Sequence, residues 1–412
     1  MPLLALLAAC GISSFGSSMT LIAIPWFVLQ STGSGAKTGL VAAAETIGML
    51  LSVALAGPLI DRFGAYRASV VADLTTAVVV VAIPLSYATS GLPLPLLVVL
   101  SFAIGAGRAP SRSAKQVLLP HVIARTGTSV ERGTSGEEAM LQGGDLLGTP
   151  VGGLLIALTG PTQTLLVDAI ALCSAAFLVL LLCRPGKVDV TPDQVEAEPG
   201  KRNYLDDLRT GVRHLLRDRL LVALGGVSAV SNALGIALVS VFLPAYGVTV
   251  WHSSLMVGFL IAAASAGSIV GTVLYGWRGA GVGRRRLFAG GLLLSGAPIY
   301  LVVALNPPPA VLVLLVFLLF TGNGPINPVL AAVKYDRVPE RMRGTVFGAF
   351  NTITSIAMPL GLVFGGVLLD GVGLTAATLS AGAASLLITL CPAVFPIWRQ
   401  MAKAPEQAST VG

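Results

Sequence analysis

Residues 220–277 read LLVALGGVSAVSNALGIALVSVFLPAYGVTVWHSSLMVGFLIAAASAGSIVGTVLYGW, and these 58 consecutive positions contain no Asp, Glu, Lys or Arg. Residues 74–107 and 287–333 are also free of these four residue types. Each run is long enough for two membrane spans of about 20 residues with a hairpin between them. The surface of a soluble domain needs far more charge, so we expect a polytopic membrane protein.

The composition of the whole chain supports this class and favours helices. Only 11% of the residues are charged, against roughly 25% in ordinary globular domains. Helices satisfy their own backbone hydrogen bonds in lipid, and the apolar runs are too long for barrel strands. We therefore expect an all-α protein with twelve spans. They lie near residues 4–29, 38–57, 68–89, 94–113, 137–158, 163–183, 219–246, 254–277, 286–305, 310–333, 344–369 and 373–396.

The basic residues predict how these spans are oriented. Of the 26 Lys and Arg residues, all but Lys37 fall in alternate connections, in the ends of the spans that border these connections, or in the C-terminal tail. By the positive-inside rule that side is cytoplasmic, so both termini are expected inside, in the cytoplasmic (inner) membrane. The net charge of +7 then reflects topology, and we expect no nucleic-acid partner. The apolar segment after Met1 is interpreted as a retained first helix, although Met1 itself need not be the true start.

The chain is expected to contain two halves, residues 1–184 and 219–412, joined by a cytoplasmic linker at 185–218. Within the linker, an amphipathic surface helix is predicted by apolar residues on one face, namely Leu205, Leu208, Val212, Leu215 and Leu216. The halves repeat at an offset of 219 residues, because Gly57, Gly64, Lys115 and Pro120 match Gly276, Gly283, Lys334 and Pro339. Two parallel six-helix repeats are an architecture of alternating-access transporters.

The connection between spans 2 and 3 carries a family signature. It reads GPLIDRFGAYR from Gly57 to Arg67 and resembles the signature loop of the major facilitator superfamily. The resemblance implies that Asp61 holds the halves shut on the cytoplasmic side by contacting the chain near Gly344, and that Arg62 and Arg67 stabilise the loop. Gly57 and Gly64 allow a tight turn, and Arg112, at the cytoplasmic end of span 4, is assigned to the same conformational latch. The second copy has Ala280 in place of the Asp, so the latch is expected on one side only.

Span 5 carries a second motif, GGDLLGTPVGG at residues 143–153. It is similar to the antiporter motif of the drug-efflux branch, through Gly148, Pro150, Gly152 and Gly153, although Thr149 interrupts the pattern. Small residues admit a neighbouring backbone, and Pro150 removes one helical hydrogen bond. Residues 105–120 also resemble exporters related to enterobactin and macrolide efflux proteins. The resemblance covers nearly the whole chain and implies export of small molecules.

Four carboxylates, Glu45, Asp73, Asp145 and Asp168, fall within the expected spans, where a charged side chain costs about 2.5–3.5 kcal/mol. Glu45 is a candidate for proton coupling or cation binding, because desolvation disfavours its charged form; a structural hydrogen bond is the alternative. Asp145 is a second coupling candidate, or else pairs with Arg108 or Arg112. Asp73 is expected to neutralise a basic residue, and Asp168 to be structural. Arg108 needs a partner, either in a proton relay or latch or in a static ion pair.

Polar residues in several spans are candidates for a central cavity, since intramembrane polar groups usually face inward. The candidates are Asn232, Asn327 and Asn351, together with serines and threonines of spans 1 and 11. Dry helix packing is the alternative for the serines. The start of span 5 is expected near Ser135 and Glu138, which match a helix-capping pattern.

We therefore predict a proton-coupled exporter of small amphiphilic compounds that works by alternating access. A facilitator or importer with the same fold is the near alternative, and a membrane sensor or scaffold the distant one. No metal or cofactor motif is found, the four cysteines are interpreted as small buried hydrophobes, and the dispersed histidines disfavour an enzyme. The expected partners are a small-molecule substrate, protons and the lipid bilayer, and a monomer is expected.

Overall fold

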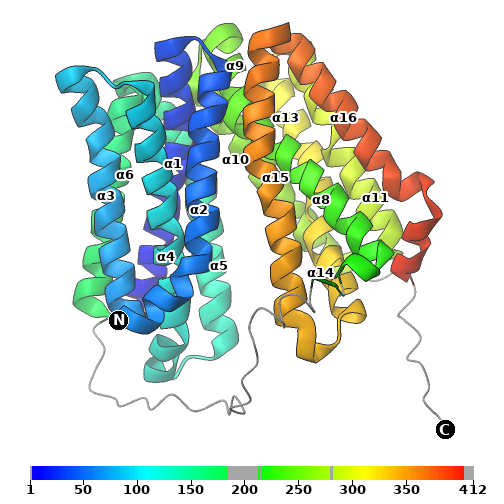
Figure 1. Cartoon of the computed structure of the whole chain (residues 1–412), viewed down its shortest axis with the longest axis horizontal. Helices are drawn as coiled ribbons and strands as arrows, with labels where there is room; N and C mark the ends of the chain where they lie inside the picture. Colours follow the sequence, from blue (N-terminus) through cyan, green and yellow to red (C-terminus); the bar gives the residue numbers. More distant parts are fainter. Residues whose placement is uncertain (1, 184–211, 214, 279–281, 403–412) are drawn as a thin grey trace. The chain divides into compact units, whose positions relative to one another are not determined.

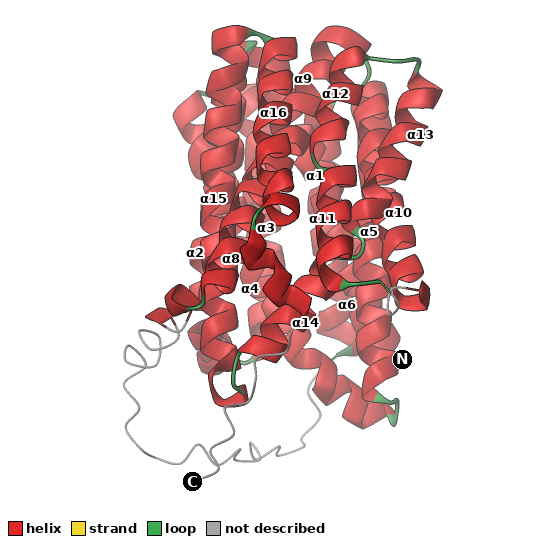
Figure 2. Cartoon of the chain, turned by 90° about the vertical axis from the view of Figure 1, so that its right-hand side faces the viewer, coloured by secondary structure: helices red, strands yellow, loops and turns green. Residues whose placement is uncertain are grey.

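The computed structural model describes residues 2–183, 212–213, 215–278 and 282–402. Among these residues there are helices and no strands (Figure 2). Twelve helices in the described part of the chain are long and apolar enough to cross a membrane. The predicted all-α membrane fold is therefore confirmed.

The first six spans are unbroken helices joined by short turns (Figure 1). They are α1 (Pro2–Thr32), α2 (Gly35–Phe63), α3 (Ala65–Ser90), α4 (Leu94–Thr126), α5 (Val130–Thr159) and α6 (Pro161–Leu182). Gly64 and Gly160 separate consecutive helices with φ of 79° and 93°, a conformation that a residue without Cβ adopts without strain. The expected capping pattern at Ser135 and Glu138 is wrong, because α5 already begins at Val130, with Ser129 at its N-cap position.

Several of the later spans are interrupted. Span 7 consists of α8 (Arg219–Ala237), the π-helix η1 (Leu238–Phe242), α9 (Leu243–Tyr246) and the π-helix η2 (Gly247–Trp251). Pro244 has no N–H for the helical ladder, which accounts for a non-α turn beside it. Span 8 is α10 (Ser254–Arg278). Span 9 is α11 (Arg284–Ser295) and α12 (Ala297–Leu305), and span 10 is α13 (Pro309–Phe320), η4 (Thr321–Asn323) and α14 (Ile326–Arg337). After η5 (Glu340–Met342) come α15 (Arg343–Val372), α16 (Leu374–Val394) and η6 (Pro396–Ala402).

The chain forms two compact units. The first comprises Met1–Pro185, Gly235–Ser265 and Met358–Thr378. Within it α1 packs against α5 and α6, α2 against α4, and α3 against α4 and α6. The segments 235–265 and 358–378 belong to this unit although they come from the second expected half. The division into halves at 1–184 and 219–412, which was inferred from the sequence repeat, stays a prediction. The compact units have different boundaries from these halves.

The second unit comprises Gly186–Leu234, Ala266–Ala357 and Leu379–Gly412. Its core includes Leu220, Phe288, Val329, Phe350 and Trp398, and the Phe288 and Trp398 rings stack at 5.7 Å. The predicted linker helix lies largely outside the described residues, but Leu215 is buried in this core.

An ion pair lies at the start of α8 in the second unit. Asp218 accepts hydrogen bonds from the amides of Leu220 and Leu221, and from Arg337 Nε at 2.7 Å. Burial raises the pKa of Asp218, but the hydrogen bond and charge of Arg337 and the two amides outweigh it and hold the pKa below its usual value.

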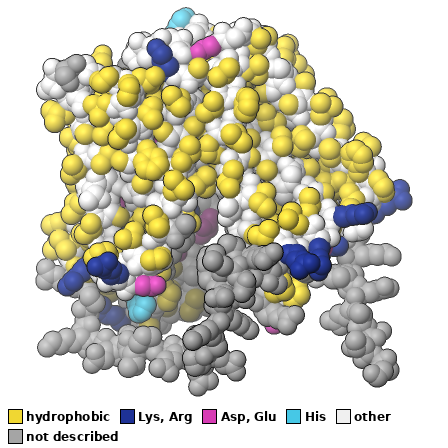
Figure 3. Space-filling view, in the orientation of Figure 1, with side chains coloured by type: hydrophobic (Ala, Val, Ile, Leu, Met, Phe, Trp, Pro, Cys, Tyr) yellow, Lys and Arg dark blue, Asp and Glu magenta, His cyan; other side chains and the backbone are white. Residues whose placement is uncertain are grey.

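The surface is apolar over a broad band. In the face shown in Figure 3, hydrophobic side chains cover much of the described surface, and the Lys and Arg side chains lie in a few separate groups instead of being spread among them. A surface of this kind is what a chain surrounded by lipid requires.

The cysteines differ in their burial: Cys10 and Cys183 are buried as expected, whereas Cys391 is half-buried and Cys173 is exposed on α6.

Candidate functional site

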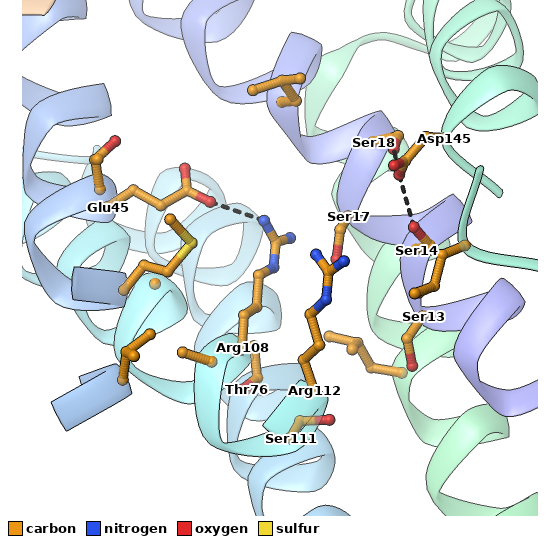
Figure 4. A pocket seen from close by; sticks show the side chains of 18 of the residues that line it. Ser13, Ser14, Ser17, Ser18, Glu45, Thr76, Arg108, Ser111, Arg112 and Asp145 are labelled. Carbon is orange, nitrogen blue, oxygen red and sulfur yellow. Dashed lines mark hydrogen bonds and ion pairs between the residues drawn. The ribbon is translucent and has the colours of Figure 1, made fainter. Parts of the chain in front are cut away.

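The first unit contains a cavity of about 500 Å³ whose walls carry most of the intramembrane charges. Helices α1 to α5 contribute most of its polar side chains, and α1 alone supplies four hydroxyls, from Ser13, Ser14, Ser17 and Ser18 (Figure 4). Apolar side chains complete the wall, among them Leu21 from α1 and Met49 and Val53 from α2. The cavity therefore offers hydrogen-bonding groups, charges and apolar surface together.

An ion triad lies at this cavity. Arg108 Nη1 donates to Glu45 Oε1 at 2.7 Å, and Arg108 Nη2 donates to Asp168 Oδ2 at 2.8 Å. The Asp168 side chain is 0% exposed, whereas 22% of the Glu45 side chain is exposed toward the cavity it lines. Thr20 donates a further hydrogen bond to Asp168 Oδ2 at 2.5 Å. Two carboxylates thus share one guanidinium, which leaves one negative charge in excess when all three groups are ionised.

Glycines on the two neighbouring helices create this geometry. A Cβ at Gly105 of α4 would collide with the backbone carbonyl of Glu45, and one at Gly48 of α2 would collide with that of Phe102. Helices α2 and α4 therefore touch backbone to backbone, and Arg108, nearly one turn beyond Gly105, reaches Glu45. Similarly, a Cβ at Gly16 of α1 would collide with Asp168 Oδ1, so the absence of a side chain there admits the carboxylate.

Asp145 has different partners from those that the sequence suggested. The hydroxyls of Ser14 and Ser18 both donate to its Oδ1, at 2.6 and 2.7 Å (Figure 4). The alternative of an ion pair with Arg108 or Arg112 is wrong, because Arg108 pairs with Glu45 and Asp168, and no ion pair among the described residues joins Arg112 to Asp145. The side chain of Asp145 is exposed to the cavity.

A second ion pair is fully buried. Lys115 Nζ lies 2.8 Å from Asp73 Oδ2, and the two side chains are 3% and 1% exposed. The contact is ionic without hydrogen-bond geometry, while Ser111 donates to the other oxygen of Asp73 at 2.5 Å and Lys115 donates to Ser13 at 2.7 Å. The prediction that Asp73 neutralises a basic residue is confirmed.

The glycines of the span 5 motif bring helices into contact. A Cβ at Gly148 would lie 2.5 Å from the Phe15 carbonyl oxygen of α1, and one at Gly152 would lie 2.9 Å from Met19 Cα. A Cβ at Gly153 would lie 2.5 Å from the Ser254 carbonyl oxygen of α10. Pro150 lies inside α5 without ending it. The expected close packing is confirmed, and an antiport role for these residues stays a prediction.

With the geometry established, comparison with known proteins identifies the family. The family model described as Major Facilitator Superfamily matches residues 6–250 and 225–410, which together cover nearly the whole chain. The chain belongs to the major facilitator superfamily. Since this is a family of transporters, the prediction of a membrane transporter rather than an enzyme is confirmed.

Curated relatives of this major facilitator chain are named as drug pumps. A protein from Mycolicibacterium fortuitum named multidrug efflux pump Tap is 29% identical over 403 residues, which cover 97% of both chains. Another of the same name from Mycobacterium tuberculosis (strain ATCC 25618 / H37Rv) is 29% identical over 410 residues, covering 98% of this chain and 96% of the relative.

Solved structures agree in fold. The nucleoside transporter NupG superimposes with a TM-score of 0.77 at 12% identity, covering 95% of this chain and 98% of that one. A bacterial homolog of the human lysosomal transporter Spinster gives 0.72 at 14% identity, with 98% of both chains covered. At these identities the similarity concerns the fold alone.

The superfamily signature loop lies at the turn from α2 to α3. Gly64 forms the turn, Gly57 lies within α2, and Asp61, Arg62 and Arg67 are exposed. Gly344 lies in the other compact unit, so the latch contact stays a prediction. Arg112, assigned to the same latch, instead lies in the cavity wall one turn beyond Arg108 (Figure 4).

The three asparagine candidates lie in the second unit and do not line this cavity. Asn232 donates to the Thr354 carbonyl at 3.4 Å, while Asn327 and Asn351 are exposed. Their role in substrate binding stays a prediction. Asp168 is the member of the ion triad that sequence reasoning left out of the site. A count of charges could have indicated its role. The first six expected spans contain four intramembrane carboxylates but only two arginines, Arg108 and Arg112, so more than one carboxylate could share an arginine.

Proposed function

We propose that this chain is a proton-coupled efflux transporter of small amphiphilic drugs or drug-like metabolites in the cytoplasmic (inner) membrane. The observation that carries the proposal is the triad of Glu45, Arg108 and Asp168 at the wall of the cavity. Its excess negative charge is cancelled by one proton, so binding of a proton and binding of a substrate can be linked through one site. The drug-pump names of relatives that align along the full chain support export.

Glu45 is the carboxylate that exchanges the proton in this mechanism. Its side chain faces the cavity, whereas Asp168 is fully buried behind Arg108. Protonation of Glu45 favours one conformation and substrate binding the other, and the ratio of affinities in the two states sets how far the equilibrium moves. The exposed Asp61 latch would set the balance between the states, with the chain acting as a monomer.

The proton gradient is large enough to drive such export. One proton entering across roughly 100 mV and one pH unit supplies about 2.3 plus 1.4 kcal/mol. At about 1.4 kcal/mol per decade, this sustains a gradient of a few hundredfold for a neutral compound. The mixed wall of serine hydroxyls and apolar side chains suits amphiphilic molecules.

Proton release from acid-loaded inverted vesicles tests the proposal directly. A panel of lipophilic drugs, macrolides and siderophores is added, and we expect release with some compounds that is lost in Glu45→Gln. Glu340→Gln is the matched control, because its side chain is 87% exposed in a surface pair with Arg343. It should behave as the unmodified protein.

Two results would redirect the proposal. Compound uptake or exchange without proton movement would indicate a facilitator or importer with the same fold. Proton release that persists at full rate in Glu45→Gln would remove Glu45 from the coupling mechanism, and Asp145→Asn would then be measured in the same assay.

A further inference from the structure

Two polar atoms of the ion triad are buried and have no hydrogen-bond partner among the described residues. They are Arg108 Nε, a donor, and Asp168 Oδ1, an acceptor. Both residues already share one hydrogen bond, from Nη2 to Oδ2. A guanidinium binds a carboxylate side-on through Nε and Nη2, with one hydrogen bond to each oxygen. The unsatisfied atoms are thus the pair needed to complete a two-bond fork between Arg108 and Asp168.

The hydrogen bond from Arg108 to Glu45 keeps the second hydrogen bond of the fork, from Nε to Asp168 Oδ1, from forming. Nη1 donates to Glu45 Oε1 at 2.7 Å, so the guanidinium is stretched between carboxylates on α2 and α6 (Figure 4 shows the Glu45 side of the triad). A buried donor and a buried acceptor left unsatisfied destabilise this arrangement. It persists because the charge of Glu45 holds the Nη1 end of the guanidinium.

Asp168 is the fixed member of the triad and Arg108 the mobile one. The Asp168 carboxylate is fully buried, receives the Thr20 hydroxyl on Oδ2 and lies against Gly16 on α1. Arg108 has a long, flexible side chain that is 15% exposed at the cavity. A change of pairing therefore occurs by rotation of the guanidinium and leaves Asp168 in place.

The other charged groups around the triad do not replace Asp168 in this role. Asp73 from α3 and Lys115 from α4 neutralise each other. Asp145 from α5 is held by the serines of α1, while Arg112 from α4 and Glu137 from α5 also line the cavity. None of these described groups forms an ion pair with Arg108.

We propose that Asp168 is a positioning residue that receives Arg108 when Glu45 takes up a proton. A proton from the cavity forms an O–H bond with the Glu45 carboxylate, and the Nη1 hydrogen bond to Oε1 is released. Arg108 then turns and donates through Nε to Asp168 Oδ1, so that the triad becomes neutral and its buried atoms are satisfied. Because the fork withdraws the guanidinium from the cavity wall, protonation changes the surface that a substrate meets. This inference deepens the proposed coupling at the same site and rests on it.

The pH profile of transport distinguishes this role from a purely structural one. In Asp168→Asn, the charges of Arg108 and Glu45 cancel without a proton. Glu45 should therefore bind its proton only at a proton concentration at least tenfold higher than in the unmodified protein. We expect the pH of half-maximal transport to move at least one unit toward acid. Thr20→Val removes the hydrogen bond to Asp168 but keeps its charge, and it should move the midpoint by well under one unit. A folded Asp168→Asn protein with an unchanged profile would overturn the inference.

A second measurement needs no folded Asp168 variant. In ¹⁵N-arginine-labelled protein in lipid nanodiscs, the Nε–H signal of Arg108, assigned by its loss in Arg108→Lys, should shift downfield on acidification as Nε gains an acceptor. The same signal at acid and neutral pH would contradict the fork. This outcome is separate from the proposed function, because vesicles that release no protons with any compound would refute antiport while the Nε signal still reports whether the fork forms.

Discussion

Arg108 binds two carboxylates, Glu45 on α2 and Asp168 on α6, and so joins two helices that are distant in sequence. The sequence placed Glu45 and Asp145 among the coupling candidates because a carboxylate in an apolar span requires a compensating interaction. It could not assign the partners, since these depend on how each helix is rotated about its axis. Asp145 turns toward serines of α1, and Asp168, expected to be only structural, turns toward Arg108.

The buried pair of Lys115 and Asp73 allows a prediction at the residue scale. Lys115→Met removes the only cation in contact with Asp73 among the described residues and leaves a buried carboxylate with one hydroxyl donor. Breaking a buried pair from one side costs about 3–5 kcal/mol, whereas replacing both charges is often close to neutral. We expect a clearly lower thermal unfolding midpoint in detergent for Lys115→Met.

The double variant Asp73→Asn/Lys115→Met supplies the comparison for this pair. It should recover most of the lost stability, because no uncompensated charge remains in the buried site. A double variant that is no more stable than Lys115→Met would show that the ion pair is not the source of the effect.

At the scale of helices, the twelve spans could be predicted because long uncharged runs fix their number and approximate positions. The ends of the helices were harder to predict from the sequence. Helix α4 runs to Thr126 and α5 begins at Val130, since helical structure continues beyond the apolar part of each span. Interactions between spans were also hidden: Asp370 near the end of α15 accepts from the amides of Gly35 and Ala36 at the start of α2, at 2.6 and 3.0 Å. Local sequence gives no sign of so distant a cap.

The glycines of α5 provide a matched pair of substitutions. An alanine at Gly148 would place its Cβ 2.5 Å from the Phe15 carbonyl oxygen and 2.9 Å from Ser18 Cβ, so α1 and α5 must separate. Overpacking of this kind costs about 1–3 kcal/mol. A Cβ at Gly143 on the same helix would have no atom of another helix within 4 Å, so Gly143→Ala should be neutral or stabilise by up to about 1 kcal/mol.

Thermal unfolding of the two purified variants measures this difference. We expect Gly148→Ala to unfold at lower temperature than the unmodified protein and Gly143→Ala at the same or a higher temperature. Equal midpoints for the two alanine variants would mean that contact between α1 and α5 does not limit stability.

At the scale of the whole molecule, the repeat explains the order of helices but not the chemistry of each copy. Lys115 and Lys334 occupy equivalent positions, yet Lys115 pairs with Asp73 inside the first unit. Lys334 lies over the rings of Phe347 and Phe350 in the second, at 5.1 and 4.8 Å. The charged cavity lies in the first unit, and the two equivalent lysines have different surroundings.

The orientation of the chain decides which way the proton moves through this cavity, and it can be measured separately. In a background without the native cysteines, Ser129→Cys places an exposed thiol at the turn before α5, and Thr159→Cys places one at its other end. If basic connections are cytoplasmic, a membrane-impermeant maleimide should label Thr159→Cys in intact cells and Ser129→Cys only after permeabilisation. The reverse pattern would place the termini outside. The interior of inverted vesicles corresponds to the outside of the cell for either topology, so proton release caused by a drug would still indicate efflux, but the proton would then pass through the cavity from the side of the termini.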